Sequence, residues 1–150
     1  MTTQNEIVKF PHPVLSKVAS PVQPGEFGTD ELNSLINRMI AVINYTGANG
    51  LAAVQINVDK ALVIYRNKVG ALTVLCNPTI IARSGKVKSY GEGCLSSPGF
   101  RLDIRRSKAI RVKAQTVEGE EIILKEQGFT AVILQHEIDH MNGKLITDVI

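Results

Sequence analysis

The chain has 150 residues, of which 44% are hydrophobic and 21% are charged, and its formal net charge is +3. These values are ordinary for a globular protein and predict one domain spanning residues 1–150. The Lys and Arg residues are dispersed, so we expect no specific nucleic-acid binding, and no apolar run approaches the roughly 18 residues of a membrane helix. The N-terminus lacks the features of a secretion or transit signal, so we expect a cytoplasmic protein.

The first third of the sequence combines an irregular segment with a helix. Four of the six prolines lie in residues 7–24, and because proline interrupts helices and central strands, we expect an arm that wraps the surface. Thr29 and Asp30 suit a helix N-terminus, and apolar residues then recur at three- and four-residue steps up to Gly47. This periodicity predicts an N-terminal amphipathic helix with a core-facing stripe: Leu32, Leu35, Ile36, Met39, Ile40 and Ile43.

The next segment, GANGLAAVQ at residues 47–55, is rich in glycine and alanine and ends at Gln55. Small residues allow a backbone to come close to a ligand or to a packed helix. A buried glutamine amide must find hydrogen-bond partners. The composition alone is equally typical of a tight turn, so the segment becomes informative only together with the other motifs.

Two β-hairpins are expected in the middle of the chain. Residues 61–66 and 71–76 are apolar, β-rich runs around a four-residue loop, and Asn77 and Pro78 should end the second strand. Residues 110–117 and 121–125 form a second pair whose apolar and polar residues alternate, so one face should be solvated. Cys76 has no nearby histidine or acid along the chain and is interpreted as a small buried hydrophobe.

The segment YGEGCLSSPGF, residues 90–100, separates the two hairpins and is rich in Gly, Ser and Pro. That composition predicts a loop. It carries Glu92 and Cys94, which places a thiol at the centre of the loop.

The segment FTAVILQHEIDHM, residues 129–141, contains an HExxH pattern. If it is helical, His136 and His140 stand one turn apart on one face, where two imidazoles can share a metal ion, and Glu137 lies about 100° round from the first. Two core histidines are the alternative, but burying both without partners would be unfavourable. Because no βαβ rhythm appears, we expect an α+β fold with antiparallel strands packed around a central HExxH helix.

A catalytic metal usually takes three protein ligands, so a third must come from elsewhere in the chain. The candidates are Cys94, Glu92, Asp139 and Cys76. Asp139 projects away from the two histidines, and a thiolate is a better partner than a carboxylate for a divalent transition metal. Cys94 on its glycine-rich loop is therefore the predicted third ligand.

Three segments together resemble the peptide deformylases: GLAAVQ at 50–55, EGCLS at 92–96 and QHEIDH at 135–140. The resemblance implies an enzyme that removes the formyl group from the N-terminal methionine of newly made polypeptides. It implies one metal ion bound by Cys94, His136 and His140, usually Fe(II) in the cell and often replaced by Ni(II), Co(II) or Zn(II). It also implies that Arg101 helps to anchor the peptide and that Phe129, Val132 and Ile133 line the methionine pocket.

The residue types fit this chemistry. A divalent metal ion makes water a nucleophile at neutral pH. Glu137, beside the ligands, can take a proton from that water and pass it to the departing amine. The Gln55 side-chain amide and the Leu95 backbone N–H are the candidate donors to the developing oxyanion, and Gly50 would line the opposite wall.

The sequence also departs from the family pattern. The usual GxGLAA begins here as Ala48-Asn49-Gly50, at a place where peptide substrates are held, and Gly91 stands where an acidic residue is common. Only ten residues follow His140, whereas many bacterial members continue into a C-terminal helix that docks on the ribosome. We therefore expect a short, phage-type member, monomeric, whose ribosome contact is left open.

Two other functions were considered. HExxH alone is also typical of metalloproteases, but these seldom use a thiolate as the third ligand. A non-catalytic, metal-stabilised binding module would explain the altered residues Ala48 and Asn49. Such a module has no use for Glu137, which favours the deformylase hypothesis.

Overall fold

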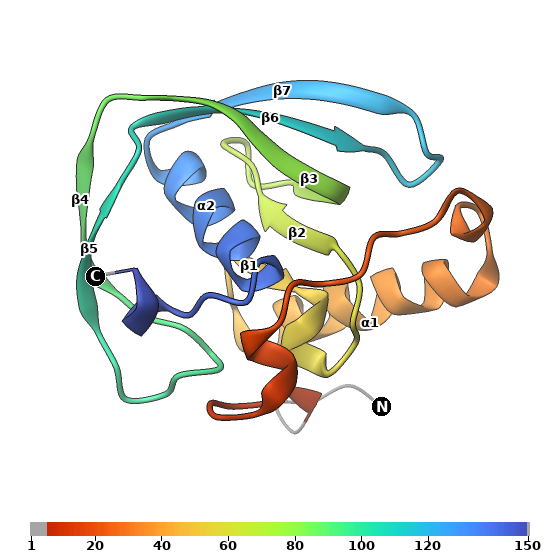
Figure 1. Cartoon of the computed structure of the whole chain (residues 1–150), viewed down its shortest axis with the longest axis horizontal. Coiled ribbons are helices and arrows are strands. Elements are labelled where there is room, and N and C mark those ends of the chain that lie inside the picture. Colours follow the sequence, from red (N-terminus) through yellow and green to blue (C-terminus); the bar gives the residue numbers. More distant parts are fainter. Residues whose placement is uncertain (1–5, 150) are drawn as a thin grey trace.

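The computed structural model describes residues 6–149 and contains two α-helices and seven β-strands (Figure 1). The helices are α1 (Asp30–Thr46) and α2 (Phe129–Met141). The strands are β1 (Gly50–Ala52), β2 (Leu62–Arg66), β3 (Leu72–Ser84), β4 (Val87–Glu92), β5 (Leu102–Arg106), β6 (Ala109–Gln115) and β7 (Glu121–Gln127). Neither helix in the described range is long and apolar enough to cross a membrane.

The strands form two antiparallel sheets, so the predicted α+β class is confirmed. The larger sheet has the order β1-β2-β3-β6-β7, and the smaller one pairs β4 with β5. Both expected hairpins are present, as β2–β3 and as β6–β7. The N-terminal arm is irregular, as expected, and is interrupted by short 3-10 turns at Pro13–Ser16 and Pro24–Glu26.

Strands β3 and β4 both extend into segments that the sequence predicted to be non-strand. Asn77 and Pro78 do not end the third strand, because β3 continues to Ser84 through a register shift between Cys76 and Thr79. Asn77 adopts a φ of 51°, and its side chain bonds both the N–H and the carbonyl of Val22 in the arm. A β-bulge accommodates a proline that a regular central strand would not.

The second difference concerns the expected loop at residues 90–100. Its first residues belong to β4, which ends at Glu92, so only the part after Glu92 is a loop. The pairing of β4 with β5 places Glu92 opposite Leu102. This small sheet therefore fixes the residue that precedes the Cys94 loop.

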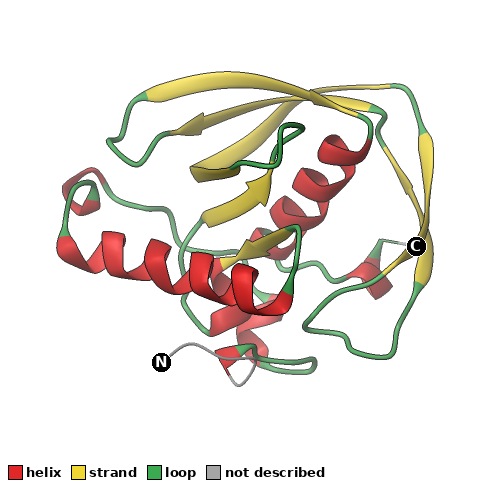
Figure 2. Cartoon of the chain, turned by 180° about the vertical axis from the view of Figure 1, so that it is seen from behind, coloured by secondary structure: helices red, strands yellow, loops and turns green. Residues whose placement is uncertain are grey.

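Strand β2 lies between the two helices, with one helix on each face of the sheet (Figures 1 and 2). Val63 and Tyr65 belong to the cluster that includes the apolar residues of α2, whereas Leu62 and Ile64 belong to the cluster of α1. A strand that is buried on both faces shows a continuous apolar run, which explains the sequence LVIY.

Helix α2 is held at both its start and its middle. The Glu126 carboxylate accepts hydrogen bonds from Tyr65 on β2, at 2.5 Å, and from Thr130 in the first turn, at 2.8 Å. The Gln135 side chain bonds both the N–H and the carbonyl of Ser107, each at 2.9 Å. These contacts fix the rotation of the helix that carries the HExxH residues.

Candidate active site

The three predicted metal ligands lie together. His136 and His140 of α2 approach each other to 3.2 Å between their Nε2 atoms, and the Cys94 Sγ lies 3.1 Å from the Nε2 of His140. One ligand atom from each of the three residues lies within 4.8 Å of the others. Among residues 6–149, this is the group of His, Cys, Asp and Glu side chains that could hold a metal ion.

The chemistry of these donors fits a divalent transition metal. Sulfur and imidazole nitrogen are the ligand types that such ions prefer, and three ligands leave a position open for a small molecule. Both histidines are buried, and the Nδ1 of His140 has no hydrogen-bond partner. Lone pairs packed this closely without a cation or shared proton between them repel one another, so the arrangement suits a bound cation.

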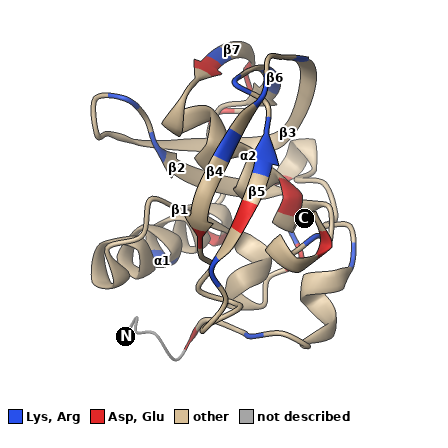
Figure 3. Cartoon of the chain, turned by 90° about the vertical axis from the view of Figure 1, so that its left-hand side faces the viewer, with Lys and Arg blue, Asp and Glu red and all other residues tan. Residues whose placement is uncertain are grey.

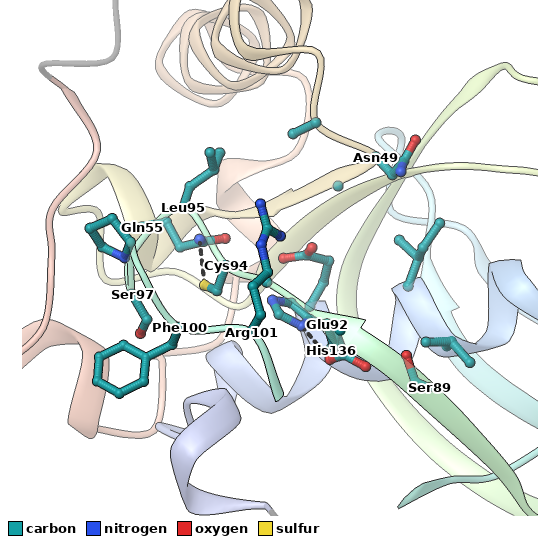
Figure 4. A pocket seen from close by; sticks show the side chains of 18 of the residues that line it. Asn49, Gln55, Ser89, Glu92, Cys94, Leu95, Ser97, Phe100, Arg101 and His136 are labelled. Carbon is teal, nitrogen blue, oxygen red and sulfur yellow. Dashed lines mark hydrogen bonds and ion pairs between the residues drawn. The ribbon is translucent and has the colours of Figure 1, made fainter. Parts of the chain in front are cut away.

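Glu92 was a candidate ligand, but its carboxylate bonds the outer nitrogen of a histidine instead. The Nδ1 of His136 lies 2.8 Å from the Oε1 of Glu92, which fixes the ring with its Nε2 toward Cys94 (Figure 4). Burial would raise the pKa of Glu92, but hydrogen bonds from His136 and Arg106 outweigh it and lower the pKa to about 2. A carboxylate behind a ligating histidine is a common arrangement in metal sites.

Arg106 connects two carboxylates behind the site and was not identified from the sequence. Only 5% of it is exposed, and it forms ion pairs with Glu92 and with Asp139 of α2. The bond to Asp139 is 2.5 Å long, and Asp139 is not among the three residues whose ligand atoms cluster. In the sequence LDIRRS, Arg105 and Arg106 look alike, and only the strand register shows which one is buried.

The two histidines differ in their electrostatic surroundings. Burial lowers the pKa of His140 well below its ordinary value, and the neighbouring His136 lowers it further. Burial also acts to lower the pKa of His136, but hydrogen bonding to Cys94 and Glu92 raises it to about 10. The carboxylate of Glu92 and the hydrogen bond to Cys94 therefore favour a cation on the His136 side of the site.

Glu137 lies beside the ligands and faces the pocket. It is 5% exposed, and its Oε1 has no hydrogen-bond partner. Burial is the main cause that raises its pKa to about 7. A carboxyl group with a pKa near neutrality can both accept and donate a proton at physiological pH, which is what a general acid-base residue needs.

Gln55 approaches the site from the opposite side, at the end of the GANGLAAVQ segment. Its Oε1 accepts a hydrogen bond from the Ala52 N–H at 3.0 Å, so its NH2 group points toward the Cys94 loop. That NH2 group lies 3.3 Å from the Ser96 hydroxyl and 3.7 Å from the Cys94 sulfur (Figure 4). The predicted donor is therefore beside the predicted ligand.

The remaining predicted residues line one cavity of about 760 Å³ that opens beside the ligands. Leu95 follows Cys94 along its wall, and Gly50 of β1 lies on the other side, against Glu137. The three residues predicted to line a methionine pocket form an apolar section of the wall at the start of α2. They are Phe129, Val132 and Ile133. Arg101 also lines the cavity, and its side chain is seen in Figure 4.

Proteins with similar sequences include several peptide deformylases. A family model described as polypeptide deformylase matches residues 4–150. A peptide deformylase from Cellvibrio japonicus is 40% identical over 145 residues, which cover 95% of this chain and 83% of that protein. One from Desulfosudis oleivorans is 37% identical over 147 residues, covering 95% and 83%.

Solved structures give the same result at the level of the fold. A crystal structure of a class I type b peptide deformylase from Acinetobacter baumannii, bound to Met-Ala-Ser, superposes with a TM-score of 0.90 at 32% identity and covers 96% of each chain. The match of the family model and the identity to the curated relatives both extend over nearly the whole chain. The chain belongs to the polypeptide deformylase family.

Proposed function

We propose that Cys94, His136 and His140 hold one divalent metal ion, Fe(II) in the cell, for which Ni(II), Co(II) or Zn(II) can substitute. The site would use it to hydrolyse the N-formyl group of an N-terminal formyl-methionine, releasing formate and a free amine. The observation that carries this proposal is the position of Glu137, whose unpartnered Oε1 is buried beside the three clustered ligands. When bound, the ion would act as a Lewis acid toward water and the formyl oxygen.

Glu137 performs the proton transfers in this proposal. Its carboxylate takes a proton from the water whose oxygen attacks the formyl carbon. The C–N bond then breaks, and Glu137 gives the proton to the departing amine nitrogen. Its raised pKa, about 7, supports both roles, because donation and acceptance of the proton are then nearly balanced at neutral pH.

Gln55 and Leu95 stabilise the negative charge that develops on the formyl oxygen. The Gln55 amide is held by Ala52 with its NH2 group toward Cys94, so it needs little reorganisation during the reaction. The Leu95 N–H follows the Cys94 ligand directly along the chain. Preorganised donors of this kind are each worth roughly 10²–10³ in rate.

The substrate peptide binds in the cavity between the Gly50 side and the Cys94 loop. Its methionine side chain occupies the apolar section formed by Phe129, Val132 and Ile133. The related enzyme from Acinetobacter baumannii has been solved with Met-Ala-Ser bound, which supports a peptide beginning with methionine as the ligand class. Arg101 contributes to holding the peptide downstream of the methionine.

We further propose that the chain is one catalytic domain, residues 1–150, that acts in the cytoplasm. The two core clusters share strands β1 and β2, which supports one folding unit. Cys94 and Cys76 are both free thiols, and a reducing compartment keeps such a ligand available for metal binding.

The direct test measures formate release from a formyl-Met-Ala-Ser peptide by iron- or nickel-loaded protein. Glu137→Gln keeps the size of the side chain and should lower kcat by about 10²–10⁴-fold, with metal content unchanged. Absence of formate release by the loaded wild-type protein, or equal rates in the variant, would overturn the proposal. Metal content measured on the same samples separates loss of the ion from loss of the proton acceptor.

A further inference from the structure

Two cations at the pocket have no ion-pair partner among the described residues. They are Lys9 in the N-terminal arm and Arg101 at the end of the Cys94 loop, and both line the cavity. The ion pairs found within residues 6–149 involve neither of them. An unpaired surface cation is common, but two that face one substrate cavity affect what binds there.

The position of Arg101 is set by the glycine beside it. A Cβ built on Gly93 would lie 1.8 Å from the Nη1 of Arg101, so the guanidinium occupies the space over Gly93. Gly93 directly precedes Cys94, and Figure 4 shows the Arg101 side chain among those that line the pocket. The positive charge of Arg101 is therefore held within one residue of the predicted ligand.

The position of Lys9 is set by its two neighbours in the arm. The Val8 N–H bonds the carbonyl of Gln55 at 2.8 Å, and the Phe10 N–H bonds the carbonyl of Ser96 at 2.9 Å. Lys9 is thus carried on a segment pinned at both sides to residues of the site. Its flexible side chain supplies a second cation to the cavity wall.

No described acid on the cavity wall offsets these charges for an incoming peptide. The lining contains two carboxylates, Glu92 and Glu137. Glu92 is engaged by Arg106 and His136, and Glu137 faces the reacting centre. Gly91, also on the lining, donates its N–H to the Asp103 carboxylate at 2.9 Å, so that carboxylate, which is outside the lining, is engaged by the backbone. Figure 3 shows acidic and basic positions interspersed along β4 and β5.

Resting on the proposed function, we propose that the enzyme selects formyl-Met peptides with an acidic side chain at the second or third residue over those with a basic one there. A carboxylate on the substrate gains attraction from Lys9 and Arg101, whereas a Lys or Arg side chain meets like charge. Exposed pairs are weak individually, so two of them produce a preference of about two- to tenfold.

The test compares kcat/KM for formyl-Met-Glu-Ser, formyl-Met-Gln-Ser and formyl-Met-Lys-Ser, all with amidated C-termini, and for the matching series with the variable residue third. The expected order in at least one series is Glu, then Gln, then Lys. The ratio of Glu to Lys should shrink as NaCl rises from low salt, because exposed charges are screened. A flat or reversed order in both series overturns the proposal, while formate release from every peptide leaves the deformylase activity intact.

Charge variants identify the source of the preference. Arg101→Gln and Lys9→Gln should each reduce the ratio of Glu to Lys, and the double variant should bring it close to one. Lys68→Gln is the matched control, because Lys68 is exposed on the β2–β3 loop outside this cavity and its loss changes the net charge equally. An equal reduction in Lys68→Gln would show that net charge, rather than these two residues, produces the preference.

Discussion

A Cβ atom built on Gly50 would lie 2.8 Å from the Oε2 of Glu137, so the carboxylate occupies the space that any larger residue would need. Gly50 belongs to β1, which pairs with β2 through its contact with Tyr65. The strand therefore approaches α2 at the Glu137 carboxylate. Gly50, the fourth residue of the GANGLAAVQ segment, is thus linked to the HExxH motif by close packing rather than by a hydrogen bond.

Replacement of Gly50 by alanine should displace Glu137. A shift of about 1 Å in a reacting group can lower the rate by about 10²-fold, and we expect a fall in kcat of that order for Gly50→Ala. Gly25→Ala is the matched control, because a Cβ there meets nothing within 4 Å. Measured by formate release, activity of Gly50→Ala within twofold of the wild type would show that the carboxylate adjusts freely.

The Arg106 network should contribute to stability as well as to metal binding. Arg106→Met leaves Glu92 and Asp139 without their buried cation, and the loss of one partner of such a network destabilises by roughly 3–5 kcal/mol. Because Glu92 orients His136, metal affinity should also fall, by about 10- to 100-fold. Urea unfolding and competition with a chelating indicator measure the two effects.

A matched control for Arg106→Met is Lys113→Met. Lys113 also pairs with a carboxylate, Glu121 at 3.4 Å, but both side chains are exposed. Its free energy of unfolding should change by less than about 1 kcal/mol. Equal losses in the two variants would mean that burial of the Arg106 network adds nothing to its strength.

The lowered pKa of Glu92 predicts a pH dependence of stability. Its pKa is about 2 in the folded chain against an ordinary value of 4.5, so its stabilising contribution is complete above pH 4.5 and is lost as the pH falls toward 2. Between pH 6 and pH 3, the difference in unfolding free energy between metal-free wild type and Glu92→Gln should shrink by about 2 kcal/mol. Glu121→Gln, which removes an exposed carboxylate, is the control, and an equal decline in both variants would contradict the prediction.

Elements that depend on local patterns were predictable from the sequence. The amphipathic stripe of α1, both hairpins and the 129–141 helix each follow from periodicity or turn residues within a short window. The grouping of Cys94 with His136 and His140 could also be predicted, because the helix supplies only two ligands, a catalytic metal usually takes three, and a cysteine was available. The roles of these residues remain predictions that the proposed experiments address.

Features that depend on contacts between distant segments were not predictable. The continuation of β3 past Pro78 relies on Asn77 bonding Val22, 55 residues away along the chain. The burial of Arg106 could not be predicted from the sequence, because burying its charge becomes favourable only when the fold brings Glu92 and Asp139 to it. The contact of Gly50 with Glu137 likewise joins two segments whose proximity no local pattern encodes.

The two cysteines should differ in reactivity, and a metal ion should protect one of them. Burial is the main cause that raises the pKa of Cys76 to about 11, and its side chain is fully buried, so it should react with a thiol reagent only after unfolding. Cys94 is half-buried at the cavity and should be the one thiol that reacts in folded, metal-free protein.

Addition of Zn(II) should slow the reaction of Cys94 at least about tenfold, because a coordinated thiolate is not free to attack. Cys94→Ser should show no reactive thiol before unfolding. Labelling of Cys94 at an unchanged rate with saturating Zn(II), followed by mass spectrometry, would show that the thiol does not bind the metal, and this result does not depend on any activity measurement.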